Sequence, residues 1–324
     1  MERTAPLFWI VDDEWEEHDL ETGMLKKAVP SCEIRLTKDH FSEDLETFGK
    51  DADLLLTQIS YPITETVLRR LKRCRGIAVF GSGYNNVDVK TTRELGIPVT
   101  NVNGYCTEDL ADYVLAAILH CNKRLVAFAA NIGSGEWGAN AIHTPIHRVN
   151  TQSLLLLGFG RIGSVVAKKA HAIGMHVMVY DPFLPAEKIR SGGYEPVSVE
   201  EGLGRADYVS VHMPLTKENQ GIINRSIFEK MKPSAVFINV ARGGLVNEND
   251  LAEALGANRI GGAVLDVVAE EPIARDNPLL RAPNCLLTPH ISYASEESTR
   301  ELRSRAVENA LAMYRGEQPR DPVR

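Results

Sequence analysis

Short apolar runs alternate with longer segments of helical spacing along most of the chain. Before residue 104, the runs that predict strands are residues 7–11, 33–36, 52–57, 76–80 and 98–102. A second series follows at residues 153–157, 176–180, 208–212, 235–240, 263–267 and 285–287. Alternation of this kind is typical of parallel strands covered by helices on both faces. The pattern therefore predicts an α/β chain with two wound, parallel-sheet (Rossmann-like) domains, the second of which has six strands.

Two longer segments carry apolar residues at helical spacing. Residues 107–130 contain no proline, and Thr107 followed by two acidic residues is a typical helix start. Residues 295–315 give a second long helix after the last strand. We expect the first helix to join two domains and the second to return to the first domain. These helices predict a discontinuous, flavodoxin-like substrate or lid domain (1–103 and 291–324), a nucleotide-binding Rossmann domain (104–290) and an interdomain cleft.

Length, charge and cysteine content narrow the class of protein. A chain of 324 residues agrees with two domains. The net charge of −7 argues against a surface that neutralises nucleic-acid phosphates, and the basic run at residues 69–75 better fits the solvated side of a helix. No apolar run approaches a membrane span, the amino terminus lacks the features of a secretion signal, and the five cysteines have no metal-type spacing. We therefore expect a cytoplasmic protein without a metal site, nucleic-acid partner or membrane contact.

The run at residues 153–157 ends in a glycine-rich segment. Gly158, Gly160 and Gly163 have the spacing that a dinucleotide pyrophosphate requires. The first glycine permits a tight turn, the second leaves room for the phosphates, and the third lets the following helix pack closely. The N–H groups at the start of that helix would face the anion. The segment predicts a bound dinucleotide.

The next predicted strand ends at Asp181, about 20 residues beyond the glycines. A carboxylate in this place accepts hydrogen bonds from the hydroxyls of the adenosine ribose, and it repels a ribose 2′-phosphate. The other interpretation is that Asp181 only caps a turn before Pro182. The succession of strand, glycine loop, helix and strand favours the cofactor role, and therefore NAD over NADP.

Polar residues follow three of the later predicted strands. Arg242, Glu271 and His290 each come shortly after such a strand. Ligands of wound parallel sheets bind beyond the carboxyl ends of the strands. Each residue alone has a structural explanation, but their complementary chemistry at one sheet edge favours a shared site.

These three side chains suit hydride transfer to a carbonyl group. Negative charge builds on the carbonyl oxygen, so a proton donor and a fixed cation lower the barrier. His290 is the best proton donor near neutral pH, and Glu271 would orient the imidazole and favour its charged form. The planar guanidinium of Arg242 suits a carboxylate with a neighbouring carbonyl. The implied substrate is a 2-oxo acid, or the 2-hydroxy acid in the reverse direction.

Ser82 and Gly83 follow a predicted strand of the first domain. Their backbone N–H groups are candidates to bind the same substrate carboxylate. A plain turn is an equally good interpretation of this segment.

From about residue 53 to its carboxyl terminus, the chain resembles the D-isomer-specific 2-hydroxy acid dehydrogenase family. The resemblance rests on several motifs in the right order: residues 81–88 (GSGYNNVD), 96–99 (GIPV), the glycine loop, 239–244 (NVARGG), 265–268 (LDVV) with 271–272 (EP), and 288–290 (TPH). It implies that Arg242, Glu271 and His290 are the catalytic set. It also implies a homodimer built largely through the cofactor domains and the long linking helix. The residues that it places at the dinucleotide are Thr107, Arg161, Ile162, Asp181, Pro214, Val240, Ala241 and Asp266, the last at the nicotinamide amide.

Within the family, residues 105–109 and 292–298 look most like the C-terminal-binding-protein-like branch. That branch often has tryptophan three positions beyond the histidine, where this chain has Tyr293, so we expect a more polar substrate pocket. The leading hypothesis is an NADH-dependent reductase that converts a small 2-oxo acid to the D-2-hydroxy acid. The alternative is an NAD(H)-sensing dimer that recruits protein partners, and the retained catalytic motifs do not separate the two.

Overall fold

The chain folds into two compact units, as the computed structural model of residues 5–12 and 14–323 shows. One unit runs up to Tyr105 and resumes at Ser295, and we call it the terminal unit. The other comprises Cys106–Ala294, and we call it the central unit. The domain boundaries predicted from the sequence follow residues 103 and 290, whereas the two units divide after Tyr105 and after Ala294. The segment that contains Tyr293 therefore belongs to the central unit.

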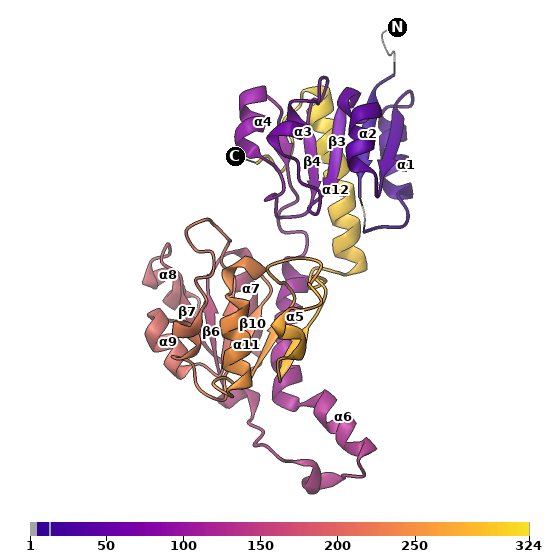
Figure 1. Ribbon diagram of the computed structural model, residues 1–324. Coiled ribbons are helices and arrows are strands. Elements are labelled where there is room, and N and C mark those ends of the chain that lie inside the picture. Colours follow the sequence, from indigo (N-terminus) through magenta and orange to yellow (C-terminus); the bar gives the residue numbers. More distant parts are fainter. Residues whose placement is uncertain (1–4, 13, 324) are drawn as a thin grey trace. The chain divides into compact units, whose positions relative to one another are not determined.

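The terminal unit is built around a five-stranded parallel sheet (Figure 1). Its order, β2-β1-β3-β4-β5, is the flavodoxin-like order. The strands are β1 (Leu7–Val11), β2 (Glu33–Thr37), β3 (Leu54–Gln58), β4 (Ile77–Phe80) and β5 (Val99–Thr100). The helices are α1 (Asp19–Ala28), α2 (Phe41–Thr47), α3 (Glu65–Leu68), α4 (Val89–Leu95) and α12 (Glu296–Arg315), with a 3-10 turn η1 (Gly49–Asp51).

Strand β1 shows why this sheet is covered on both faces. Leu7, Trp9 and Val11 belong to one apolar core, and Phe8 and Ile10 belong to the other. Since successive side chains of a strand point to opposite faces, a wholly apolar strand requires cover on both sides. Helix α12 provides part of the second cover, and its yellow ribbon lies beside β3 and β4 in Figure 1. The last helix thus completes a unit that otherwise comes from the first part of the chain.

The central unit contains a seven-stranded parallel sheet in the order β12-β11-β10-β9-β6-β7-β8. Counted from β8, this is the Rossmann order with β12 added at the far edge, and the order reverses between β6 and β9. The strands are β6 (Ser153–Leu157), β7 (His176–Tyr180), β8 (Glu195–Pro196), β9 (Tyr208–Val211), β10 (Val236–Asn239), β11 (Gly262–Leu265) and β12 (Cys285–Leu287). The helices are α5 (Thr107–Lys123), α6 (Leu125–Gly133), α7 (Arg161–Ala172), α8 (Ala186–Ser191), α9 (Val199–Arg205), α10 (Arg225–Phe228) and α11 (Glu248–Gly256). Short 3-10 turns are η2 (Gly138–Ala141), η3 (Val149–Thr151), η4 (Gly243–Leu245) and η5 (Pro278–Arg281).

The sheet has seven strands, so the prediction of six strands is wrong. The additional strand β8 pairs Glu195 and Pro196 with β7 at the edge of the sheet. Strand β8 is only two residues long, which is too short to show an alternating pattern in the sequence. Its proline also argues against a strand. An edge position nevertheless tolerates proline.

The prediction of one helix over residues 107–130 is also wrong. Helix α5 ends before Arg124, whose φ of 52° is left-handed, and α6 follows at a bend of 43°. Thr107 is the first helical residue rather than the cap, and Cys106 occupies the cap position, where its side chain does not cap the helix. Within the described residues, no single helix is long and apolar enough to cross a membrane, although α5 and α6 meet this criterion as a bent pair.

Candidate active site

The glycine loop lies where the strand order of the central sheet reverses, between β6 and α7. Gly158 has a left-handed φ of 104°, and a Cβ there would lie 2.7 Å from the carbonyl oxygen of His212. A Cβ at Gly163 would lie 2.5 Å from the carbonyl oxygen of Gly158, so α7 packs directly on the loop. The fold itself therefore requires glycine at both positions.

Gly160 differs from these two glycines. A Cβ at this position would have nothing within 4 Å, and the φ of −75° is open to other residues. The fold itself would accept a side chain at this position. A side chain would, however, obstruct a ligand that approaches the backbone at the start of α7. The loop therefore fits the pyrophosphate of a dinucleotide.

Asp181 follows β7 directly and is held beside the glycine loop. Its Oδ2 accepts a hydrogen bond from the N–H of Phe159 at 2.9 Å, and its Oδ1 accepts one from the N–H of Phe183 at 2.9 Å. Each carboxylate oxygen has two acceptor sites, so both oxygens keep one for a ligand. Asp181 thus fixes the turn, as one interpretation of the sequence suggests, and remains placed for ribose hydroxyls.

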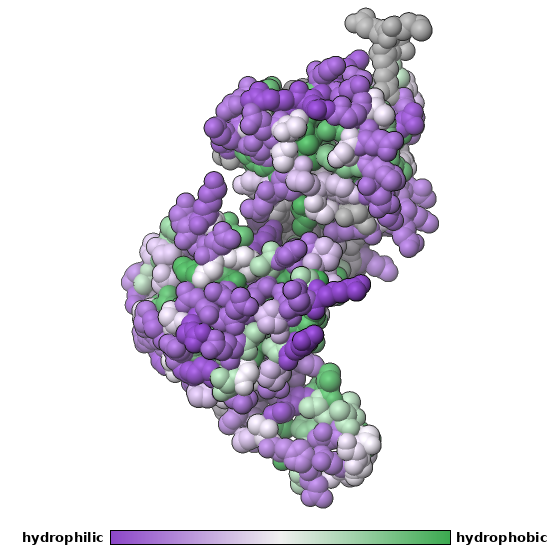
Figure 2. All heavy atoms as spheres, in the orientation of Figure 1, coloured by the Kyte–Doolittle hydropathy of each residue, from purple (hydrophilic) through white to green (hydrophobic). Residues whose placement is uncertain are grey.

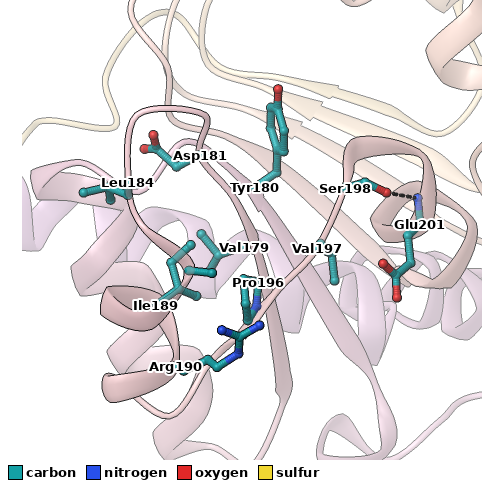
Figure 3. Close-up of a pocket in the computed structure, with 11 residues that line it drawn as sticks. Val179, Tyr180, Asp181, Leu184, Ile189, Arg190, Pro196, Val197, Ser198 and Glu201 are labelled. Carbon is teal, nitrogen blue, oxygen red and sulfur yellow. Dashed lines mark hydrogen bonds between the residues drawn. The ribbon is translucent and has the colours of Figure 1, made fainter.

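A pocket of about 280 Å³ lies beside Asp181 (Figure 3). In Figure 3, apolar side chains lie between the segment that carries Asp181 and the segment that carries Ser198. The pocket combines these apolar side chains with polar and charged ones, among them Arg190, Ser198 and Glu201. A pocket with this mixed lining and the Asp181 carboxylate at its rim suits a flat base attached to a sugar. The apolar lining residues are Val179, Leu184, Ala186, Ile189, Pro196 and Val197.

His212 follows β9 and packs against the glycine loop. Its Nε2 lies 2.9 Å from Oγ of Ser210. Burial lowers the pKa of His212 to about 4, so this imidazole is neutral at pH 7. His212 could not be identified from the sequence, because a histidine that follows an apolar strand gives no sign of how deeply it is buried.

Arg242 lies in a tight turn after β10. Asn239 fixes this turn, because its Oδ1 accepts from the N–H of Ala241 and its Nδ2 donates to the carbonyl oxygen of Arg242, both at 3.0 Å. At Gly243, a Cβ would lie 1.9 Å from the carbonyl carbon of Val268. The glycine after Arg242 therefore brings this turn against the loop that follows β11.

Glu271 and His290, which follow the paired strands β11 and β12, meet at the same edge. Nδ1 of His290 lies 2.7 Å from Oε2 of Glu271, and Oε1 accepts from the N–H of Val268 at 3.1 Å. Burial raises the pKa of Glu271, but the hydrogen bond and charge of His290, with smaller contributions from Val268 and Arg242, hold this pKa below its usual range. The side chains of His290 and Glu271 remain 28% and 36% exposed. Since Nδ1 is engaged, Nε2 is the ring nitrogen that can exchange a proton with a substrate.

Asp266 is buried at the end of β11, with 1% exposure. Its carboxylate accepts hydrogen bonds from the N–H of Ile291 (2.9 Å), the N–H of Ser292 (2.8 Å) and Oγ1 of Thr288 (2.6 Å). The resemblance implies a nicotinamide contact for this residue. In the structure it also anchors the segment that carries His290.

Glu248 anchors the loop that carries Glu271. Its Oε1 accepts from the N–H of Ala269 at 2.6 Å, and its Oε2 accepts from Nδ2 of Asn277 at 2.7 Å. These contacts bracket Glu271 on both sides in the chain. Glu248 could not be identified from the sequence, because the helix dipole alone makes acidic residues common in the first turn of a helix.

Ser82 and Gly83 follow β4 in the terminal unit. The hydroxyl of Ser82 donates to the carbonyl oxygen of Val102 at 2.9 Å, and the carbonyl oxygen of Ser82 accepts from Nδ2 of Asn101 at 2.6 Å. The side chain is therefore engaged in the fold. The backbone N–H groups remain the candidates for ligand binding that the sequence suggests.

The other predicted residues also have defined places. All except Thr107 follow a strand of the central sheet at its carboxyl end. Arg161 and Ile162 begin α7, Pro214 follows β9, Val240 and Ala241 follow β10, Tyr293 follows β12, and Thr107 begins α5.

Comparisons with known proteins agree with this arrangement. Residues 115–292 match the family described as "D-isomer specific 2-hydroxyacid dehydrogenase, NAD binding domain". A hydroxypyruvate reductase from Blautia hydrogenotrophica is 36% identical over 297 residues, which cover 90% of this chain and 91% of that protein. A glyoxylate reductase from Korarchaeum cryptofilum is 36% identical over 301 residues, which cover 91% of this chain and 90% of that protein.

Solved structures show the same architecture. The TT0316 protein from Thermus thermophilus matches with a TM-score of 0.84 and 34% identity, covering 98% of this chain and 100% of that one. The D-lactate dehydrogenase from Aquifex aeolicus, complexed with NAD and lactic acid, matches with a TM-score of 0.85 and 26% identity, covering 96% of each chain. The predicted fold class is confirmed.

The family resemblance is confirmed as well, whereas the relatives named above give no support to the alternative of a C-terminal-binding-protein-like sensor. The chain belongs to the D-isomer-specific 2-hydroxyacid dehydrogenase family, and it is an NAD-dependent oxidoreductase.

Proposed function

We propose that this enzyme uses NADH to reduce a small 2-oxo acid to the D-2-hydroxy acid, and that it catalyses the reverse oxidation at high pH. The observation that carries the proposal is the hydrogen-bonded pair of Glu271 and His290 next to the turn of Arg242, at the edge of the nucleotide-binding sheet. Hydroxypyruvate and glyoxylate are the first candidate substrates, because two similar proteins are named as their reductases.

Each of the three side chains has a role in this proposal. NADH, when bound, supplies the hydride. His290 gives a proton from Nε2 to the carbonyl oxygen as negative charge develops on that atom. Glu271 keeps the ring oriented through Nδ1 and stabilises its positive charge. Arg242 binds the substrate carboxylate. In the described part of the chain its guanidinium makes one hydrogen bond, from Nη1 to the carbonyl oxygen of Ala241 at 2.7 Å, so most of its donors remain for a ligand.

The glycine loop and the pocket beside Asp181 support the proposed cofactor site. The pocket would take the adenosine end of NAD, and Asp181 would accept from the ribose hydroxyls and disfavour NADP. Among the described residues, Oδ2 of Asp266 accepts one hydrogen bond, so it keeps an acceptor site for the nicotinamide amide. The residues that we propose to contact NAD are Thr107, Gly158, Gly160, Arg161, Ile162, Gly163, Asp181, Pro214, Val240, Ala241 and Asp266.

Three further residues are proposed to bind the substrate with Arg242. The backbone N–H groups of Ser82 and Gly83 would bind the carboxylate. Tyr293, three residues after His290, would contact the substituent on C2 and make the pocket more polar than an indole would.

We also propose a homodimer in which α6 is part of the interface. No residue of α6 is buried, and Leu125, Val126 and Ile132 are 61%, 66% and 59% exposed. Figure 2 shows green and white surface gathered over this helix. Contiguous apolar surface of this kind favours a protein contact. Light scattering should give the mass of a dimer for the parent protein and for Ile222→Asp, and a lower mass for Val126→Asp; a monomeric parent protein would refute the proposal.

A cytoplasmic location, without a nucleic-acid or membrane partner, completes the proposal. All five cysteines are free thiols, which suits a reducing compartment. Three arginines of the basic run at residues 69–75 pair with carboxylates of their own unit, which accounts for their charge within the fold. These arginines are Arg69, Arg70 and Arg73.

The direct test measures NADH oxidation with glyoxylate, hydroxypyruvate, pyruvate and phenylpyruvate. We expect His290→Ala to lower kcat by about 100-fold or more, because the proton donor is lost. The exposed His176 provides the control, and His176→Ala should leave kcat unchanged. An unchanged rate in His290→Ala would refute the assigned role.

A further inference from the structure

His290 has a backbone conformation that its own side chain does not favour. Its φ is 54°, in the left-handed region, and it is neither glycine nor asparagine. Such a conformation persists only where the surrounding contacts determine it. The contacts that hold this backbone therefore also hold the imidazole in place.

Asp266 makes such contacts with His290 and with the two residues that follow it. Its carbonyl oxygen accepts from the N–H of His290 at 2.8 Å, and its carboxylate accepts from the N–H groups of Ile291 and Ser292 at 2.9 and 2.8 Å. Three consecutive N–H groups thus donate to a single residue, which directly follows the neighbouring strand β11. The Asp266 side chain consequently fixes the backbone that directly follows His290.

Thr288 and Tyr113 set the orientation of the Asp266 side chain from the other side. Oγ1 of Thr288 lies 2.6 Å from Oδ1 of Asp266, and the hydroxyl of Tyr113 lies 2.5 Å from the same Oγ1. A threonine hydroxyl has one proton, and a carboxylate only accepts, so Thr288 donates to Asp266. Tyr113 must then donate to Thr288.

The donor role of Tyr113 agrees with its surroundings. Burial, together with the charge of Asp266, raises the pKa of Tyr113 above its usual value, although the bond to Thr288 works in the opposite direction. The phenol therefore keeps its proton in the neutral pH range. Tyr113 belongs to α5, and it lies six positions after Thr107 at the helix start.

We propose that Tyr113 is a positioning residue, which acts through Thr288 and Asp266 to hold His290 in its left-handed conformation beside Glu271. This inference rests on the proposed function, since it concerns the placement of the proposed proton donor. It predicts that the phenolic hydroxyl serves the chemical step rather than the affinity for NADH. Loss of the hydroxyl should let the segment after β12 sample other conformations, which reduces the fraction of complexes with a productive proton donor.

The test compares the parent enzyme with Tyr113→Phe, Thr288→Val and Thr288→Ser. We expect Tyr113→Phe and Thr288→Val each to lower kcat by about 10-fold, while the Kd of NADH, measured by fluorescence titration, changes less than about 2-fold. Thr288→Ser keeps the hydroxyl and should restore kcat to within about 2-fold of the parent value. Both residues act through the same chain of hydrogen bonds. The double variant Tyr113→Phe/Thr288→Val should therefore be about as slow as either single variant.

Tyr208→Phe is the matched control. It also removes a largely buried phenol hydroxyl of the central unit, one that interacts with Asn122 of α5. We expect it to lower the melting temperature as much as Tyr113→Phe does, with kcat unchanged. A similar loss of kcat in Tyr208→Phe would mean that general destabilisation explains the effect, and the proposal would be overturned.

The remaining outcomes also decide the question. The proposal is wrong if Tyr113→Phe and Thr288→Val stay within about 2-fold of the parent kcat, if Thr288→Ser is as slow as Thr288→Val, or if the losses add in the double variant. Should Tyr113→Phe not fold, the comparison of Thr288→Val with Thr288→Ser gives the same decision. His290→Ala separates this proposal from the proposed function: if it is inactive while Tyr113→Phe is fully active, only the positioning role fails, and if it is active, the proton donor itself is wrongly assigned.

Discussion

Nδ1 of His290 lies 2.7 Å from Oε2 of Glu271, although 19 positions separate the two residues in the chain. Their strands, β11 and β12, are neighbours in a parallel sheet, so both carboxyl ends meet at one edge. Arg242 follows β10, the next strand in the same sheet. Strand order, rather than any local motif, therefore places the three side chains together.

Replacing Glu271 with glutamine should weaken catalysis without removing the hydrogen bond to the ring. The amide oxygen still accepts from Nδ1–H, but the negative charge that favours the charged imidazole is lost. We expect kcat for oxo-acid reduction to fall by roughly 10- to 100-fold, which steady-state rates at about pH 7 measure. Glu270→Gln, at the exposed neighbouring position, should match the parent enzyme, and a parent-like kcat in Glu271→Gln would contradict the role of this carboxylate.

Alanine at Gly243 should damage the site through packing alone. A Cβ there would overlap the carbonyl group of Val268, so either the turn of Arg242 or the loop of Glu271 must move. We expect a loss of at least about 10-fold in kcat/KM and a lower melting temperature. Gly256→Ala, at the end of α11 where nothing lies within 4 Å, should leave kcat/KM unchanged. Equal activity of the two variants would show that the close approach at Gly243 has no catalytic importance.

The carboxylate of Asp181 should decide between the two nicotinamide cofactors. In Asp181→Asn, the amide oxygen can still accept from the N–H of Phe159, but the charge that repels a 2′-phosphate is gone. We expect the ratio of kcat/KM with NADH to that with NADPH to fall by about 10-fold or more. Asp276→Asn removes an exposed carboxylate that does not line the pocket, so it should leave the ratio unchanged. If the ratio in Asp181→Asn equals the parent ratio, another group controls the preference.

His212 should make the stability of the enzyme fall in mild acid. Burial holds the pKa of His212 at about 4 in the folded protein, against 6.5 for the free side chain. Between these values the unfolded chain binds more protons than the folded chain, so stability falls as the pH drops from about 7 towards 4. His212→Gln removes this titration. Its melting temperature, measured by scanning fluorimetry, should therefore fall less between about pH 7.5 and pH 5 than that of the parent protein. The prediction fails if both proteins lose the same number of degrees.

A residue can be assigned from the sequence where only one residue type fits its structural position. Gly158 and Gly163 are such residues, since the fold leaves no space for a side chain at either position. Arg242, Glu271 and His290 can also be predicted, because polar residues after apolar strands stand out against the pattern. These features rest on short-range sequence signals.

Contacts between distant residues could not be predicted in this way. Tyr113 and Thr288 are separated by 175 positions, and a tyrosine on an apolar helix looks like a packing residue. The left-handed residue Arg124 interrupts a segment whose apolar spacing continues without a break, so periodicity gives one helix where the structure has two. In both cases tertiary structure decides between local alternatives that the pattern leaves equal.

The chain crosses between its two units after Tyr105 and again after Ala294. The second crossing comes shortly after His290, and the intervening N–H groups of Ile291 and Ser292 both end on Asp266. These hydrogen bonds tie the chain to the central sheet between His290 and the crossing. Movement of the connection beyond Ala294 should therefore be transmitted only weakly to the imidazole and to its hydrogen bond with Glu271.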